Sequence, residues 1–325
     1  MLVNSFTNYT IGWSSTVLSQ NYTLLSIVLF GIFLHSFLWS QLFYHKIKYD
    51  LSFIFPVGYI STDVFLLCAY LVQYSIRSRA TTPTSYISCY FEAYFIIYFN
   101  TLESFYLTAL NACRYWQIVR NQNIYNRHPH FILFICAIIP LFILINMIVQ
   151  DQMSWCNVIE NVGESCSITY SSIPIRIWNV ALMFALPIII SLIASIRCVL
   201  HIKQTHSQQV LSRRNHHRQL IYRFSIFYTV WIILWGPFVL LTYLDMKTIS
   251  DQIDFIISIG STLEVAIDGI LVSALDKHFE MAWKKTYESI LLKLGLNGKK
   301  KVSPIHQLTL VMHDKMDSKN NIMNK

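Results

Sequence analysis

The sequence predicts an all-α membrane protein, in which a bundle of seven transmembrane helices is followed by an amphipathic eighth helix. One observation is composition: 54% of the 325 residues are hydrophobic and only 13% are charged, whereas a soluble domain is about one quarter charged. The second observation is a series of seven apolar stretches. The third is an uneven distribution of Lys and Arg between alternate loops, which is typical of membrane proteins.

Each stretch is long enough to cross a bilayer, whose hydrocarbon core of ~30 Å needs roughly 20 mostly apolar residues. The loops between them are short, so we expect one bundle over residues 22–275 and not separate domains. The predicted spans are 22–44, 52–74, 87–113, 131–150, 175–200, 219–244 and 253–275.

Basic residues give the bundle its orientation. Of the 25 Lys and Arg residues, all but Arg77, Arg79, Arg176 and Lys247 lie in one set of loops or in the C-terminal tail. Cytoplasmic loops carry such an excess, which places the tail in the cytoplasm and the N-terminus outside a multi-pass protein of the plasma membrane. The net charge of +8 is therefore an inner-face excess and does not indicate a nucleic-acid partner.

The segments outside the bundle differ in character. Residues 1–21 carry no Lys or Arg and contain the glycosylation sequons of Asn8 and Asn21, as expected of an extracellular N-terminus. Residues 276–294 alternate apolar and charged side chains at helical spacing, which predicts an amphipathic helix in contact with membrane lipid. The polar, Lys-rich residues 295–325 are expected to form a disordered cytoplasmic tail.

Particular residues stand at fixed places within the spans, and their order is more specific than the spans themselves. The third span has a Cys at its outer end and an Arg-Tyr pair at its inner end, and these are separated by 25 residues, from 89 to 114. The set comprises Cys89 with Cys113-Arg114-Tyr115, Ser61-Thr62-Asp63 in the second span, Phe184-Ala185-Leu186-Pro187 in the fifth, Trp235-Gly236-Pro237 in the sixth, and Asp268-Gly269 with the later Phe279. In this arrangement the chain resembles the rhodopsin-like G-protein-coupled receptors, in a divergent, invertebrate orphan form.

The resemblance implies a function for several residues. Arg114 and Tyr115 would contact a heterotrimeric G protein, while Trp235, Pro237 and Pro187 would form the activation switch.

The sequence also departs from the family pattern. The acid that usually precedes the Arg is Cys113, the Pro after Asp268 is Gly269, and the later Tyr is Val272. The usual Gly-Asn pair of the first span is missing, and His35 stands near its place. The family's restraint on the inactive state therefore cannot be carried over whole.

A disulfide between the third span and the second outer loop is also implied by the resemblance. The extracellular compartment permits such a bond. Cys89 has two candidate partners in that loop, Cys156 and Cys166, and the spacing of Cys166 from Pro187 is typical of the family. Cys166 is therefore favoured, with Cys156 left as the alternative.

The predicted ligand pocket mixes aromatic and polar side chains, as a peptide or a small neutral extracellular ligand would need. An amine ligand is not expected, because the family's amine-binding Asp is replaced by Ile96, and retinal is not expected, because Thr262 stands where light-sensing members have Lys. The pocket residues are Glu92, Ile96, Ile97, Asn100, Trp178, Asn179, Phe184, Trp235, Phe238, Thr242 and Ser258.

Four acids lie inside the spans, where ionisable residues are costly and usually functional. By resemblance Asp63 occupies the family's sodium-binding position, and Glu103, Glu264 and Asp268 fall at positions around it. Four such carboxylates need neutralisation by a cation or by protons. A sodium site, proton sensing and a protonated structural core are three alternatives that the sequence leaves open.

Two other classes of protein were weighed against a receptor. A cation transporter or channel would use the same acids as its ion path, but the sequence shows neither internal repeats nor helices broken by Gly and Pro. A membrane enzyme is not expected, because the sequence has no His-rich metal motif, no Gly-x-Ser-x-Gly and no Walker loop. No resident cofactor is expected beyond a sodium ion.

Overall fold

The computed structural model describes residues 14–44, 51–76, 86–120, 122–160, 166–204, 211–244, 251–275 and 277–293. The chain divides into two compact units, Met1–Ala282 and Trp283–Lys325, and the helical bundle belongs to the first. The elements are α1 (Ser15–Tyr44), α2 (Ile54–Leu71), α3 (Tyr86–Val119), α4 (Ile124–Arg127), α5 (Pro129–Gln152), β1 (Cys156–Glu160), β2 (Cys166–Tyr170), α6 (Ile173–Val180), α7 (Leu186–Gln204), α8 (Leu211–Leu244), α9 (Asp251–Leu275) and α10 (Lys277–Lys293).

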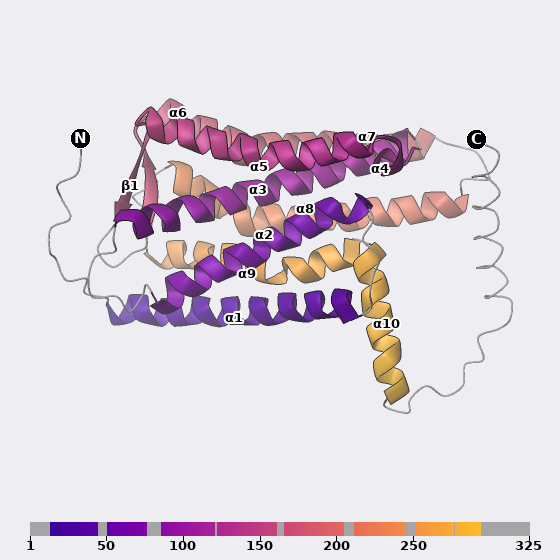
Figure 1. Cartoon of the computed structure of the whole chain (residues 1–325), viewed down its shortest axis with the longest axis horizontal. Helices are drawn as coiled ribbons and strands as arrows, with labels where there is room; N and C mark the ends of the chain where they lie inside the picture. Colours follow the sequence, from indigo (N-terminus) through magenta and orange to yellow (C-terminus); the bar gives the residue numbers. More distant parts are fainter. Residues whose placement is uncertain are drawn as a thin grey trace. The chain divides into compact units, whose positions relative to one another are not determined.

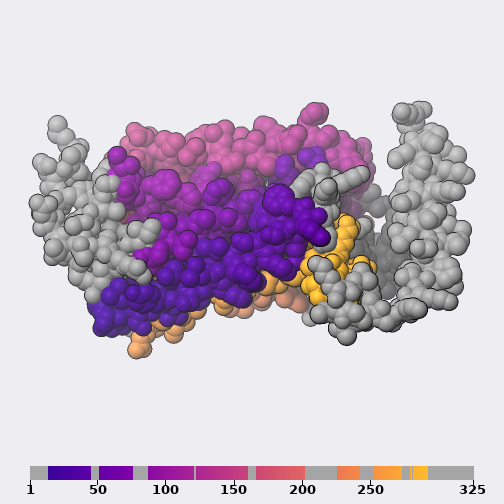
Figure 2. Space-filling model, turned by 60° about the horizontal axis from the view of Figure 1, so that its bottom comes forward, coloured from indigo at the N-terminus to yellow at the C-terminus, as the bar shows by residue number. Residues whose placement is uncertain are grey.

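The long helices of the first unit lie side by side along a common direction (Figure 1). Contacts run from α1 to α2, from α2 to α3, from α3 to α5 and α7, and then through α8 and α9 back to α1. The helices therefore close into a ring. Within it, α3 contacts three other long helices, α2, α5 and α7. Figure 2 shows the indigo and purple side chains of α1, α2 and α3 forming one continuous surface on this side of the unit.

The described part of the chain is consistent with an all-α membrane protein. Five stretches are long and apolar enough to cross a bilayer: Ser15–Tyr44, Leu51–Ser75, Pro129–Gln152, Ile173–His201 and Gln252–Val272. Large apolar side chains also point away from the bundle, as in α5, where Phe134 is 61% exposed. Such an exposed apolar surface is stable in lipid and would be costly in water.

Two of the predicted spans do not belong to those five, and each has a separate reason. Helix α3 is 34 residues long, but it carries many Tyr residues and buries polar side chains such as Asn100, Ser104 and Asn111. A helix that faces protein on most sides needs fewer apolar residues than one that faces lipid. Helix α8 runs over 34 residues, but its side chains are described only for Ser225–Leu241, and this apolar part taken alone is shorter than a span.

Several helix ends differ from the prediction. Helix α1 begins at Ser15 and not at residue 22, so Asn21, placed in the N-terminal segment by the sequence, lies within a helix. Helix α8 begins at Leu211, ahead of the predicted residue 219, because the basic residues before the apolar span continue the helix. An apolar pattern marks the length that lipid covers, and a helix can extend beyond it. Asn8 lies outside the described residues.

A small hairpin at one end of the bundle was not predicted. Strands β1 and β2 pair antiparallel, with Cys156 opposite Tyr170 and Glu160 opposite Cys166. The backbone N–H of Ser171 donates to the carbonyl of Trp155 at 2.9 Å and extends the pairing beyond the strands. We call this end of the bundle the hairpin end.

Candidate functional site

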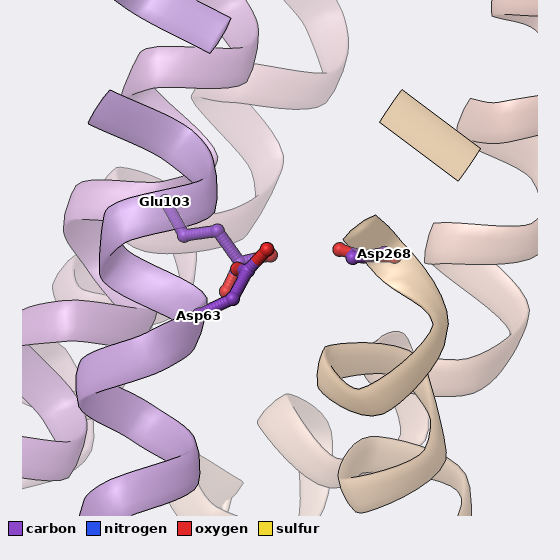
Figure 3. A group of neighbouring side chains, drawn as sticks. All are labelled: Asp63, Glu103 and Asp268. Carbon is purple, nitrogen blue, oxygen red and sulfur yellow. The ribbon is translucent and has the colours of Figure 1, made fainter. Parts of the chain in front are cut away.

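Three acidic side chains meet in the middle of the bundle, each from a different helix. Asp63 comes from α2, Glu103 from α3 and Asp268 from α9, and one oxygen of each lies within 4.8 Å of the others. All three residues are at most 2% exposed. Figure 3 shows Asp63 and Glu103 together on one side of the space between the helices, with Asp268 pointing toward them from the other.

Glu264 extends this group by one turn of α9. It precedes Asp268 by four residues, which places both on one helix face, and it is completely buried. Neither its carboxylate oxygens nor those of Asp63 have a hydrogen-bond partner among the described residues. We call Asp63, Glu103, Glu264 and Asp268 the acid cluster.

Tyr59, which was not among the predicted site residues, links two members of the acid cluster. Its hydroxyl lies 3.0 Å from Glu103 Oε1 and is also hydrogen-bonded to Asp268 Oδ2. The available signal was spacing, because Tyr59 precedes Asp63 by four residues and shares its helix face. The hydroxyl of a buried Tyr needs a hydrogen-bond partner. A Tyr on the same helix face as a buried acid is therefore expected to point its hydroxyl toward the acids.

Trp231 connects the acid cluster to an aromatic group between α8 and the start of α7. Its indole Nε1 donates to Glu103 Oε1 at 3.4 Å. Its ring lies 4.7 Å from that of Trp235 and 6.0 Å from that of Phe184, and the last two rings are 5.7 Å apart, centroid to centroid. Such tilted and offset rings attract one another. A displacement of α8 would therefore act on the hydrogen bond to Glu103.

The backbone around Phe184 is wound more loosely than an α-helix. Residues Ala181–Ala185 form a π-helical turn between α6 and α7, and Pro187 follows, without a backbone N–H to continue the usual hydrogen bonds. Thr108 of α3 donates to the carbonyl of Pro187 at 3.5 Å. These π turns often occur at functional sites, and this one directs Phe184 toward the two indoles.

The described part of the bundle offers the acid cluster no counter-charge. Among the described residues, no basic side chain forms an ion pair with any of the four acids. An ionised carboxylate in a dry interior costs several kcal/mol when it has no partner. The cluster must therefore take up protons or bind a cation, and the oxygens of Asp63, Glu103 and Asp268 are close enough to share one ion. Hard cations such as Na⁺ and Ca²⁺ prefer such oxygen ligands.

The predicted pocket residues do not all face the bundle interior. Trp178 is 54% exposed, and its Nε1 lies 3.4 Å from Asn146 Oδ1 on α5, so it belongs to the outer surface. Asn179 is buried, but its amide exchanges two 3.0 Å hydrogen bonds with that of Gln150. This amide pair joins α6 to α5 and leaves the Asn179 side chain little capacity for a ligand.

The remaining pocket residues lie at several depths. Trp235 and Asn100 are buried, and Asn100 donates to the carbonyl of Ile96 at 2.9 Å. The side chain of Thr242 lies outside the described part of the chain. Partly buried positions are Glu92, Ile96, Ile97, Phe184, Phe238 and Ser258.

At the hairpin end, Cys89 of α3 and Cys166 of β2 form a disulfide. This is the pairing favoured by the resemblance, and Cys156 is a free, buried thiol. Tyr94 Oη lies 3.1 Å from Cys156 Sγ and donates to Asp151 at 3.1 Å. Burial raises the pKa of the Cys156 thiol, and the contact with Tyr94 offsets part of that effect. The thiol is therefore a packing group and not a reactive one.

The predicted coupling residues lie at the other end of α3. Arg114 and Tyr115 are partly buried there. Cys113, the residue before Arg114, is buried beside them. Of the predicted switch prolines, Pro237 lies inside α8, where it breaks the regular backbone hydrogen bonding and favours a bend.

No family model matches the chain, and a comparison with curated proteins finds no match.

Proposed function

We propose that this protein is a receptor of the rhodopsin-like type, which transmits the binding of an extracellular ligand to heterotrimeric G proteins. The observation that carries the proposal is the arrangement along α3. A disulfide fixes Cys89 at the hairpin end, Glu103 lies in the acid cluster, and Arg114 lies near the opposite end. The 25 residues from Cys89 to Arg114 correspond to about 37 Å of helix, enough to cross the hydrocarbon layer.

The proposal assigns seven membrane spans to the bundle. These are α1, α2, α3, α5, the continuous helix of α6 and α7, α8 and α9. The polar interior of α3 supports its assignment as a span, because this helix packs against α2, α5 and α7 and therefore faces little lipid. In this orientation the hairpin end lies outside the cell and Arg114 faces the cytoplasm.

Activation would move α8 relative to α3. Pro237 provides a bend in α8, and the rings of Trp231, Trp235 and Phe184 lie where that helix approaches α7. Outward movement of the cytoplasmic half of α8 would open a cavity beside Arg114 for a G protein. The guanidinium has several N–H groups that can donate to backbone carbonyls at the end of a G-protein helix.

The ligand enters from the hairpin end in this proposal. Two of the predicted residues do not line the pocket: Trp178 is exposed on the outer surface, and Asn179 is paired with Gln150. What remains is a mixed aromatic and polar set around Trp235, Phe238 and Asn100. It suits a peptide or a small neutral molecule better than an amine, because no acid takes the place of Ile96.

The test is G-protein nucleotide exchange with the purified full chain in lipid nanodiscs. Basal exchange is expected without ligand, since Cys113 cannot restrain Arg114 as an acid would. Arg114→Ala should reduce the exchange rate at least about tenfold, equivalent to ~1.4 kcal/mol. Arg120→Ala is the matched control, because Arg120 lies just after α3 and stacks over the exposed Trp116. Equal exchange by wild type and Arg114→Ala would contradict the proposal.

Cation transport is the second candidate, and the closeness of the oxygens of Asp63, Glu103 and Asp268 favours it. A transporter carries net charge or a measurable ion across a sealed membrane. Sodium and proton flux into proteoliposomes of the full chain would therefore separate the two functions. Saturable flux that Glu103→Gln abolishes, combined with no nucleotide exchange, would favour transport over signalling.

A further inference from the structure

The hydroxyl of Tyr59 has one hydrogen but two acidic neighbours. A phenol can donate a single hydrogen bond, whereas Tyr59 Oη lies within bonding distance of both Glu103 Oε1 and Asp268 Oδ2. If both carboxyls were ionised, one of the two contacts would bring oxygen lone pairs together without a hydrogen between them. One carboxyl of the pair must therefore carry the second hydrogen.

Glu103 Oε1 already has another donor. The indole of Trp231 approaches the same oxygen at 3.4 Å. The contacts thus form a chain from Asp268 on α9, through Tyr59 on α2, to Glu103 on α3 and Trp231 on α8. Four helices are joined by this chain, and it is complete only when the carboxyl pair holds a proton.

Independent support comes from the acids that the chain does not include. Glu264 and Asp63 are fully buried, and no N–H or hydroxyl among the described residues donates to their carboxylate oxygens. Glu264 lies within hydrogen-bonding reach of the carboxyls of Asp268 and Glu103, which can bond to it only through a proton. Glu264 is close enough to Asp268, Glu103 and Asp63 for their charges to interact, and Asp63 points into the same space (Figure 3). Two further unpartnered carboxyls beside the pair increase the demand for positive charge there.

We infer that the acid cluster is a proton-binding site, in which Glu103 and Asp268 share a proton through Tyr59, and that release of this proton favours the signalling conformation. The link to signalling rests on the receptor function proposed above, whereas the bound proton does not. With the proton present, hydrogen bonds through Tyr59 hold α2, α3 and α9 together. Without it, like charges repel across these three helices, and a displacement of Glu103 is passed to α8 through the indole of Trp231.

The groups that face the pair come from each helix packed around it. Only one of them, the imidazole of His35, is able to carry a positive charge. It lies against Gly269 and approaches the carbonyl of Val265 at 3.2 Å. Helix α8 contributes the indole of Trp231, which does not titrate. Among the described residues, the titratable groups are His35 on α1, Tyr59, Asp63 and Tyr70 on α2, Glu103 on α3, and Glu264 and Asp268 on α9.

Infrared spectroscopy of the full chain in nanodiscs tests the bound proton directly. A protonated carboxylic acid has a carbonyl stretch that ionised side chains lack, and exposed acids are ionised at neutral pH. We expect this band in the wild type at neutral pH, a partial loss of it in Glu103→Gln and Asp268→Asn, and a shift in Tyr59→Phe. A wild-type spectrum without the band at neutral pH overturns the inference even if every variant misfolds.

Titrations with Na⁺ and Ca²⁺ separate a proton from a metal ion. Saturable loss of the band on addition of either cation, at constant pH, would mean that the cluster is a cation site, which overturns the proposal. Persistence of the band across physiological concentrations of both ions supports it.

Nucleotide exchange measured against pH tests the coupling separately. The basal rate of nucleotide exchange should rise several-fold over the pH range in which the infrared band disappears. This rise should be absent in Glu103→Gln. A rate that does not change with pH, in a protein that shows the band, overturns the link to signalling and leaves the receptor proposal standing. A protein that shows the band but catalyses no exchange at any pH refutes the receptor function and leaves the proton site standing.

Discussion

Replacement of Glu103 by Gln should stabilise the folded protein at high pH, and the structure gives the magnitude. The oxygens of Asp63, Glu103 and Asp268 lie within 4.8 Å of one another. Two unit charges at that separation repel by about 3.5 kcal/mol at an effective dielectric constant of 20. Gln keeps the shape of Glu, carries no charge and supplies N–H groups, so it can replace both the carboxyl and its proton.

The sign follows from counting protons in each state. An unfolded chain releases its carboxyl protons near pH 4, whereas the folded cluster retains at least one above that pH. The folded state therefore binds more protons, and wild-type stability falls as pH rises from about 4 until the cluster loses its proton. Above that point Glu103→Gln should exceed the wild type by about 3.5 kcal/mol, which corresponds to roughly 10 °C in the unfolding midpoint of a bundle of this size.

Thermal unfolding in detergent, followed by circular dichroism between pH 5 and about 9, measures this difference. Glu288→Gln is the matched control, because it makes the same chemical change at an exposed position on α10 and leaves the acid cluster intact. Parallel curves for wild type and Glu103→Gln would refute the argument, since they would show that the charge of Glu103 does not differ between the folded and unfolded states.

Three further predictions concern the rest of the bundle. Cys166→Ala should destabilise the protein by about 4.5 kcal/mol in thermal unfolding, since its disulfide closes a 77-residue separation, whereas Cys156→Ala should leave non-reducing peptide maps unchanged. The Cys156 thiol, whose pKa is raised by burial, should resist maleimide at pH 8 in the folded chain and react once it is denatured. Gly31→Ala should cost about 1–3 kcal/mol, because an added Cβ would lie 2.8 Å from the Cα of Ala266; an unchanged unfolding midpoint would contradict this packing.

The resemblance placed Asp63 at a sodium-binding position and the other three acids around it, and local spacing supported that prediction. Glu264 and Asp268 are one turn apart on α9, and Glu103 is about three turns from Arg114 on α3. Apolar length likewise indicated most of the spans. Local spacing can be counted in any single sequence. The length of a span follows from the known thickness of the bilayer.

Contacts between segments that are far apart in the sequence could not be predicted from local spacing. Tyr59 and Asp268 are 209 residues apart, and the pairing of Asn179 with Gln150 depends on how α6 lies against α5. In the hairpin, β2 does alternate apolar and polar side chains, which is a strand signal that the prediction did not use, whereas β1 lacks this alternation. Trp231 is one of several aromatic residues in α8, and only the packed bundle shows which of them reaches an acid.

Two departures from the family pattern occupy the same space and are better understood as one. Gly269 stands where the family that the chain resembles has Pro. His35 stands near the place where that family has a Gly-Asn pair in the first span. A Cβ on Gly269 would lie 3.2 Å from both Cε1 and Nε2 of the His35 ring, so a larger residue at 269 requires the imidazole to move. The ring also approaches the carbonyl of Val265 at 3.2 Å, four residues before Gly269, where a Pro at 269 would itself remove a helix hydrogen bond. The imidazole and the glycine therefore maintain the contact between α1 and α9 at the turn that carries Asp268, and a change in either one alone would displace an acid of the cluster.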